Sequence, residues 1–339
     1  MKIFVTLRPN ERCISIKFKH IFMKTFLKYL LATILGVFLV QVIIFFIFIG
    51  MIAGVSSVEE TVNVKPSSVL HMQLNYQVKE RTSDNPFEDF SFGGGMKTKE
   101  KLGLVDILKN LRKAATDDNI KGIYLDLTSV QAGFGSIEEI RQALLKFKES
   151  GKFIVAYSDY YTQGAYYLAS VADSIFLNPE GEIEWKGLRS DIMFYKGALE
   201  KLGIEPQIVR HGKFKSAIEP FILDKMSDAN REQTSTYLGS MWNYVVKNVA
   251  TSRKVSEDQL NLIADSLLIG CSADALSLKM IDGIIYKDEF FAKLKALSGS
   301  TEDYAELITI EKYNKAPRTS KEDMPKDKIA IVYANGQID

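Results

Sequence analysis

Cysteine and histidine are both scarce in this 339-residue chain, which has two cysteines and three histidines. Cys13 and Cys271 lie on opposite sides of a long apolar segment, and the sequence has no C-x-x-C motif. The sequence therefore predicts neither a disulfide framework nor a cysteine-based zinc site. With so few histidines, a zinc centre or a Ser-His-Asp triad is not expected either. We expect no metal and no cofactor.

The chain also has almost no excess of one sign of charge. The chain has 43 basic and 42 acidic residues, a net charge of +1, so we expect no nucleic-acid partner. Apolar residues make up 46% of the chain, which is enough for a sizeable core in one or two domains.

Two common catalytic or cofactor motifs are absent or incomplete. There is no G-x-S-x-G nucleophile elbow. Gly133-Phe-Gly135 opens a predicted helix, but a dinucleotide-binding G-x-G-x-x-G motif would need a third glycine at Glu138. Ser136 and Glu139 have the spacing of a helix capping box, which accounts for that serine structurally. Nucleotide binding is not predicted.

A long apolar run is present from Tyr29 to Val55, with Gln41 as its only strongly polar residue. About 20 apolar residues suffice for a helix to cross a bilayer, so residues 29–55 are predicted to span one. The preceding basic residues are Arg8, Arg12, Lys17, Lys19, Lys24 and Lys28, and acidic residues follow the run. This asymmetry predicts a cytoplasmic leader at 1–28, an inner-membrane anchor, and a main domain on the periplasmic side. A cleavable signal peptide is the competing interpretation.

Beyond the apolar run, strand and helix patterns alternate, which is typical of an α/β fold with a parallel sheet. The predicted strands are residues 69–78, 122–127, 153–157, 174–177, 207–210 and 305–311. The predicted helices between them are residues 104–116, 137–147, 165–172 and 194–202. A helical extension follows at residues 228–251, 257–266, 273–280 and 289–297.

The end of the sequence suggests an internal repeat. Residues 314–327 are polar and contain two prolines, which predicts a linker. Residues 329–338 form a strand-like segment similar to residues 69–78, so a second repeat is predicted to begin at 328 and to be truncated at 339. Chance similarity of two strand-like decamers is the alternative. In the repeat interpretation, the first repeat occupies residues 56–313, before the linker.

One basic segment, residues 211–221, lies between the predicted strands and the helical extension. Lys213 and Lys215 would point to the same side of an extended chain. Their apolar neighbours are Phe214, Ala217, Ile218 and Phe221. Surface charge is the default interpretation of a lysine. If these neighbours bury one lysine, however, the lowered pKa of its ammonium would suit a general base acting on a serine hydroxyl.

The same segment, Gly212-Lys-Phe-Lys-Ser-Ala-Ile-Glu-Pro-Phe221, resembles the lysine-bearing segment of long-type signal peptide peptidase A, in its amino-terminal half. Residues 161–170, 172–177, 185–187 and 195–197 are similar to that family too. The resemblance implies Clp/crotonase-like ββα repeats and a serine–lysine dyad that degrades cleaved signal peptides. It implies that Lys215 is the general base, that the serine comes from a second repeat, and that the full-length form is a homo-oligomer.

The resemblance fails at the position of the nucleophile. Gln163 occupies the place of the serine, and an amide cannot serve as a nucleophile of this kind. We therefore expect this chain to supply the lysine half of a dyad and to be inactive alone, with signal-peptide remnants or short apolar peptides and the lipid bilayer as its partners. The alternatives are a non-catalytic membrane scaffold or truncated remnant, and a crotonase-like enzyme acting on acyl-thioesters.

Overall fold

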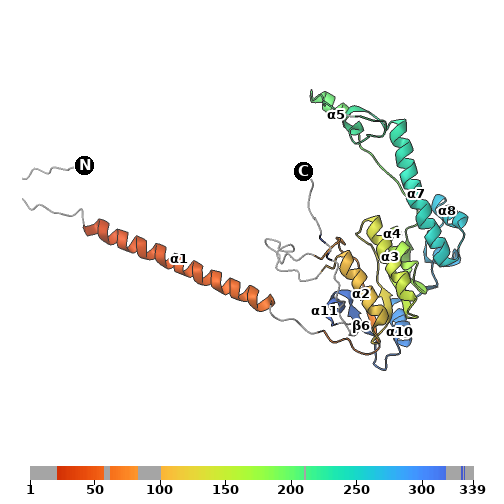
Figure 1. Cartoon of the computed structure of the whole chain (residues 1–339), viewed down its shortest axis with the longest axis horizontal. Coiled ribbons are helices and arrows are strands. Elements are labelled where there is room, and N and C mark those ends of the chain that lie inside the picture. Colours follow the sequence, from red (N-terminus) through yellow and green to blue (C-terminus); the bar gives the residue numbers. More distant parts are fainter. Residues whose placement is uncertain are drawn as a thin grey trace, which may run out of the picture. The chain divides into compact units, whose positions relative to one another are not determined.

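The computed structural model describes residues 21–56, 62–82, 101–209 and 211–317, together with Ala330 and Val332. The chain divides into two units, Met1–Glu60 and Thr61–Asp339 (Figure 1). Each unit is described separately.

The first unit contains one long helix, α1 (Ile21–Ser56). Its segment Thr25–Gly50 has a mean hydropathy of 2.9 over 26 residues, and it is long and apolar enough to cross a membrane. The predicted apolar helix is confirmed. It begins before residue 29 because the preceding lysines and aromatic residues continue the helical turn, and lysine is a good helix former.

The second unit is built on a six-stranded parallel sheet with the order β5-β4-β3-β2-β1-β6. The strands are β1 (Ser68–Met72), β2 (Ile120–Leu125), β3 (Phe153–Tyr161), β4 (Ser174–Ile183), β5 (Gly283–Ile284) and β6 (Glu306–Thr309). Ile123 lies opposite Leu70 on one side and Ile154 on the other, so the apolar runs are in register across the sheet. The predicted α/β fold with a parallel sheet is confirmed.

Helices cover both faces of this sheet. They include α2 (Leu104–Thr116), α3 (Phe134–Lys148), α4 (Gln163–Ala169), α9 (Ser272–Ser277), α10 (Lys287–Ser298) and α11 (Ile310–Lys315). The main core includes Leu70, Ile123 and residues of α2, α3 and α4. The next residues along the strands, Val69 and Tyr124, belong to a smaller core that includes Phe290 of α10. This alternation follows from the two-residue period of side chains along a strand.

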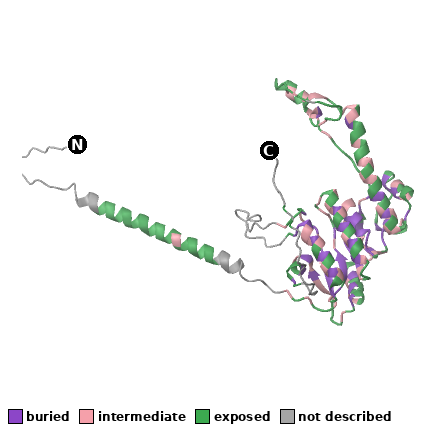
Figure 2. Ribbon diagram, viewed as in Figure 1, coloured by how far each residue is buried: buried purple, intermediate pink, exposed green. Residues whose placement is uncertain are grey.

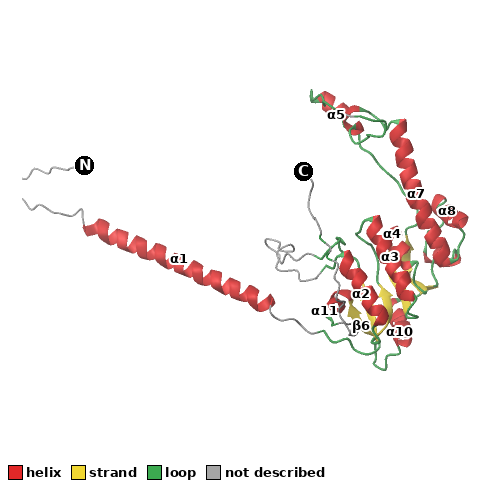
Figure 3. Ribbon diagram, in the orientation of Figure 1, coloured by secondary structure: helices red, strands yellow, loops and turns green. Residues whose placement is uncertain are grey.

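A second group of helices leaves the α/β body. It comprises α5 (Lys196–Lys201), α6 (Glu219–Ile222), α7 (Asp228–Arg253) and α8 (Glu257–Asp265). The buried residues of α7 nearest the body are Val245, Val246 and Val249, whereas its earlier turns are mostly exposed (Figure 2). Residues 186–241 are called the arm below. They comprise the mostly loop segment between β4 and α7, which includes α5 and α6, and the first part of α7; α5 lies at the end of α7 away from the sheet (Figures 1 and 3).

Three local predictions need correction or stay open. The predicted strand at 207–210 is wrong for residues 207–209, which are irregular. Val209 is fully exposed there, so its β propensity has no sheet against which to act. The predicted linker at 314 begins inside α11, because the Thr309 side chain caps that helix by accepting a hydrogen bond from Lys312 N. Apart from Ala330 and Val332, the predicted second repeat lies outside the described residues.

Candidate functional site

Lys215 lies in the arm and is exposed to solvent. It borders an open hollow of about 420 Å³. The other residues lining this hollow are Val209, His211, Phe214, Ser216, Ala217 and Ile218. The default interpretation of surface charge describes its surroundings here, because the flanking Phe214 and Ala217 are themselves exposed and do not bury it.

The two lysines of the segment have different surroundings. The Nζ of Lys213 lies 3.6 Å from the carboxylate of Glu232 and 5.0 Å from the ring centroid of Phe214. Among the described residues, no hydrogen bond or ion pair engages the Lys215 ammonium. Of the two, Lys215 is therefore the one available to another molecule or another part of the protein.

Glu219 fixes the segment that carries Lys215. Its side chain is buried and accepts hydrogen bonds from the Ser227 hydroxyl at 2.6 Å and from Asn230 Nδ2 at 3.0 Å. Ser227 is also the N-cap of α7, where its hydroxyl accepts a hydrogen bond from Asn230 N. One carboxylate thus joins the lysine segment to the first turn of α7.

A second set of contacts joins this segment to α5. The backbone N–H of Tyr195 donates to the carbonyl of Pro220 at 2.7 Å, and the ring of Tyr195 stacks on Phe221 at 6.0 Å. Next to it, Lys196 pairs with Asp224 at 3.2 Å, and this partner raises the pKa of the lysine. The outer arm is therefore held together by its own polar and aromatic contacts.

Gln163 is the first residue of α4, directly after the N-cap Thr162. Its Oε1 accepts hydrogen bonds from the backbone N–H groups of Lys186 at 3.0 Å and Gly187 at 3.1 Å. Its Nε2 donates to the carbonyl oxygen of Gly187 at 3.1 Å. The residue predicted to occupy the position of the nucleophile is therefore an amide whose polar atoms are hydrogen-bonded to the start of the arm.

Trp185 is the last residue of the α/β body before the arm begins. It is only 3% exposed, and its Nε1 donates to the carbonyl of Leu260 in α8 at 2.9 Å. The ring lies 5.8 Å from Tyr166 and 5.0 Å from Trp242 of α7. The outgoing and returning ends of the arm therefore meet at a pair of tryptophans.

The inner part of α7 is bound to the body through Arg141 of α3. This guanidinium is 1% exposed, and it donates to Ser170 at 2.8 Å, to the carbonyl of Asn248 at 3.1 Å and to Ser252 at 2.6 Å. It also lies over the ring of Tyr167 at 4.5 Å. Burial lowers the pKa of Arg141, but a guanidinium keeps its charge at any physiological pH.

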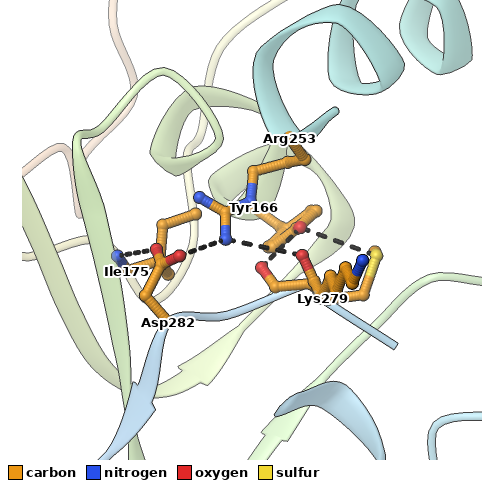
Figure 4. Close-up of polar contacts among 6 residues, drawn as sticks. Tyr166, Ile175, Arg253, Lys279 and Asp282 are labelled. Carbon is orange, nitrogen blue, oxygen red and sulfur yellow. Dashed lines mark hydrogen bonds and ion pairs between the residues drawn. The ribbon is translucent and has the colours of Figure 1, made fainter. Parts of the chain in front are cut away.

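The end of α7 is fixed by Arg253 (Figure 4). Its guanidinium donates to Asp282 at 2.8 Å and to the carbonyl of Lys279 at 3.4 Å, while Asp282 accepts the backbone N–H of Ile175 in β4 at 2.8 Å. Beside them, the hydroxyl of Tyr166 donates to the carbonyl of Met280 at 2.7 Å. Burial alone would lower the pKa of Arg253, but the bond to Asp282 raises it overall.

A further polar cluster, unrelated to the arm, lies at the carboxyl ends of β1 and β2. His71 and Gln73 both donate to one oxygen of Asp126, at 2.9 and 2.6 Å, and the His71 ring stacks on Tyr124 at 4.9 Å. Burial alone would raise the pKa of Asp126, but these two hydrogen bonds hold it below its ordinary value. Sequence analysis missed this cluster, because its members are far apart in the chain.

Within the described residues, no group of three or more His, Cys, Asp or Glu side chains is arranged to bind a metal ion.

Comparison with known proteins supplies the family. A family model described as Peptidase family S49 matches residues 146–301, a region that contains both Gln163 and Lys215. The chain is 33% identical over 258 residues to protease 4 of Salmonella typhi, covering 73% of this chain and 41% of that protein. The chain belongs to peptidase family S49.

Two further relatives agree. Protease 4 of Haemophilus influenzae is 33% identical and covers 70% of this chain. The chloroplastic serine protease SPPA of Arabidopsis thaliana is 33% identical and covers 81% of this chain. The chain spans about two fifths of the length of these relatives: 41%, 40% and 39% of the three proteins. The resemblance to signal peptide peptidase A is confirmed.

Proposed function

We propose that this S49 chain is the lysine-bearing half of a membrane-anchored serine endopeptidase that degrades cleaved signal peptides. Lys215 would act as the general base, and a serine on a region outside this chain would be the nucleophile. The anchor would be α1, with the α/β body on the extracytoplasmic side as its flanking charges favour. Full-length molecules would associate as homo-oligomers.

One observation carries this proposal. Lys215 is exposed on the arm without an ion-pair partner among the described residues, while the neighbouring Lys213 is paired with Glu232. A general base must reach the proton that it removes, so it has to be accessible to the nucleophile. An unpaired lysine beside an open hollow meets this requirement.

The same exposure supports a role for a second region. Burial disfavours a charged ammonium, so a region that covers the lysine would favour the neutral amine that a general base needs. A serine-bearing region that docks over the hollow would bring the nucleophile and remove water from the ammonium in one step. Gln163 supports this division of labour, since the equivalent position in this chain offers no hydroxyl.

The experiment compares Lys215→Ala with Lys213→Ala at the native locus. Membranes carrying Lys215→Ala are expected to hydrolyse an apolar signal-peptide substrate about 100-fold more slowly or worse, the usual loss for a missing general base. Membranes carrying Lys213→Ala should retain most of the activity. Unchanged hydrolysis with Lys215→Ala would overturn the proposal.

A non-catalytic scaffold is the second candidate, and Gln163 at the nucleophile position favours it. A scaffold predicts that signal-peptide hydrolysis in membranes is the same with and without the chain. The proposed peptidase predicts that deleting the chain and substituting Lys215→Ala have equal effects. The comparison of the deletion with the point variant therefore separates the two.

A further inference from the structure

Gln163 uses all of its polar atoms on two consecutive residues. The Oε1 atom receives both N–H groups of Lys186 and Gly187, at 3.0 and 3.1 Å, and Nε2 returns a hydrogen bond to Gly187 O at 3.1 Å. Three hydrogen bonds from one side chain constrain both peptide units. Gln163 is itself fixed, because Thr162 caps the first turn of α4.

The clamped residues lie where the chain leaves the body. Trp185 is 3% exposed, whereas Lys186 and Leu188 are exposed and the chain stays mostly exposed up to α5. Gly187 has φ +82°, in the left-handed region that favours glycine. Gly187 therefore sets the direction in which the arm departs, and the amide of Gln163 is the side chain that holds it there.

The arm has a second attachment through α7, which Arg141 and Arg253 bind to the body. A rigid presentation of Lys215 requires both attachments, because a chain held at one end can still rotate about it. The outer contacts of Glu219 and Tyr195 then fix the lysine segment to the start of α7 and to the start of α5. These contacts, joined by the backbone of residues 188–194 and 216–218, connect the first turn of α4 to Lys215 within the described residues.

We infer that Gln163 is a positioning residue for Lys215, acting through the exit of the arm at Lys186 and Gly187. This inference rests on the proposed function in assigning the lysine a catalytic task. A general base must be held within hydrogen-bond reach of its nucleophile, and small misplacements are costly. The position predicted to hold the nucleophile in related repeats is therefore occupied, in this chain, by a glutamine that orients the segment carrying Lys215.

The first test measures the clamp directly, by hydrogen–deuterium exchange on the full chain in nanodiscs. Gln163→Met keeps the length of the side chain but has none of its hydrogen-bonding groups, so exchange at Lys186 and Gly187 should accelerate about 10-fold. Gln163→Glu keeps the acceptor oxygen for the two N–H groups but loses the donor to Gly187 O, so its exchange should accelerate less than in Gln163→Met. Gln233→Met, at an exposed site on α7, is the matched control. Unchanged exchange in Gln163→Met would overturn the inference.

The second test measures where the arm points. Spin labels at Lys213→Cys on the arm and Glu149→Cys on the body, with both native cysteines replaced by serine, report the distance between the two. The distance distribution should broaden in Gln163→Met and broaden less in Gln163→Glu, which keeps the acceptor oxygen but not the donor. Faster exchange with an unchanged distribution would mean that Gln163 holds only its own loop, which contradicts the inference.

The third test concerns catalysis and separates the two proposals. In native membranes, Gln163→Met should lower kcat about 10-fold and leave KM unchanged, since the lysine is misplaced while substrate contacts persist. If Lys215→Ala leaves hydrolysis unchanged, the proposed function fails, while the exchange and distance measurements still decide the role of Gln163. If Lys215→Ala abolishes hydrolysis and Gln163→Met does not alter kcat, only the inference about Gln163 fails.

Discussion

The indole rings of Trp185 and Trp242 lie 5.0 Å apart between centroids, at the two points where the arm joins the α/β body. Each ring also has a hydrogen bond of its own: Trp185 Nε1 donates to the carbonyl of Leu260, and Trp242 Nε1 to Asn261 Oδ1 at 2.8 Å. Both acceptors belong to α8. This helix therefore closes the base of the arm, and the two tryptophans fix the spacing between its ends.

Trp242→Ala should loosen this base. We expect the free energy of unfolding to fall by about 2 kcal/mol, less than for a fully buried tryptophan because Trp242 is half-buried. Limited proteolysis should cut the arm faster than in the unsubstituted chain. Tyr237→Ala is the control, since Tyr237 is 62% exposed on the outer part of α7 and its loss should change stability by less than about 0.5 kcal/mol.

Arg141 tests the other attachment of α7. Arg141→Met removes a buried guanidinium that donates to Ser170, the C-cap of α4, and to two groups on α7, so all three lose a charged donor. We expect a loss of about 3 kcal/mol or more in the free energy of unfolding, measured by urea denaturation. Lys146→Met on the same helix is the control, because its side chain is 78% exposed. Equal midpoints for the two variants would contradict this account of how α7 is anchored.

The lowered pKa of Asp126 predicts how the free energy of unfolding changes with pH. Its pKa is held below the ordinary value by His71 and Gln73, so the folded state favours the carboxylate. The resulting stability is fully present above the ordinary carboxyl pKa of about 4 and is lost as pH falls through the lowered pKa. Asp126→Asn should therefore reduce the loss of stability below about pH 4, measured as urea midpoints between about pH 6 and 2.5. The exposed Asp258→Asn should leave the profile unchanged.

The α/β body could be predicted from the sequence because its signals are local. Apolar strands such as residues 122–127 and the amphipathic helix at 104–116 have periods that report burial directly. The strand predicted at 207–210 is wrong at residues 207–209, because propensity alone does not supply a neighbouring strand. The two-residue strand β5 is too short to give a pattern.

The candidate site could be predicted only in part. Lys215 and Gln163 were identified through resemblance, since a lysine or a glutamine alone carries no signal of its task. The burial of Glu219 and the bond of Gln163 to Gly187 depend on contacts between elements, which no local period encodes. The apolar neighbours of Lys215 would suggest that it is buried. It is exposed because those neighbours lie on the arm, where they face solvent rather than the core.

Glu219 gives the sharpest test of how the lysine segment is held. Glu219→Ala removes the acceptor of the Ser227 hydroxyl and of Asn230 Nδ2, so residues 211–221 lose their buried contact with the start of α7 and keep only the exposed Lys213–Glu232 pair to that helix. We expect hydrogen–deuterium exchange in that segment to rise about 10-fold or more while exchange in β2 and β3 stays unchanged. Glu219→Gln keeps an acceptor oxygen and should show a smaller effect. If exchange rises equally in the sheet strands, Glu219 stabilises the whole unit and the arm is not a separately held element.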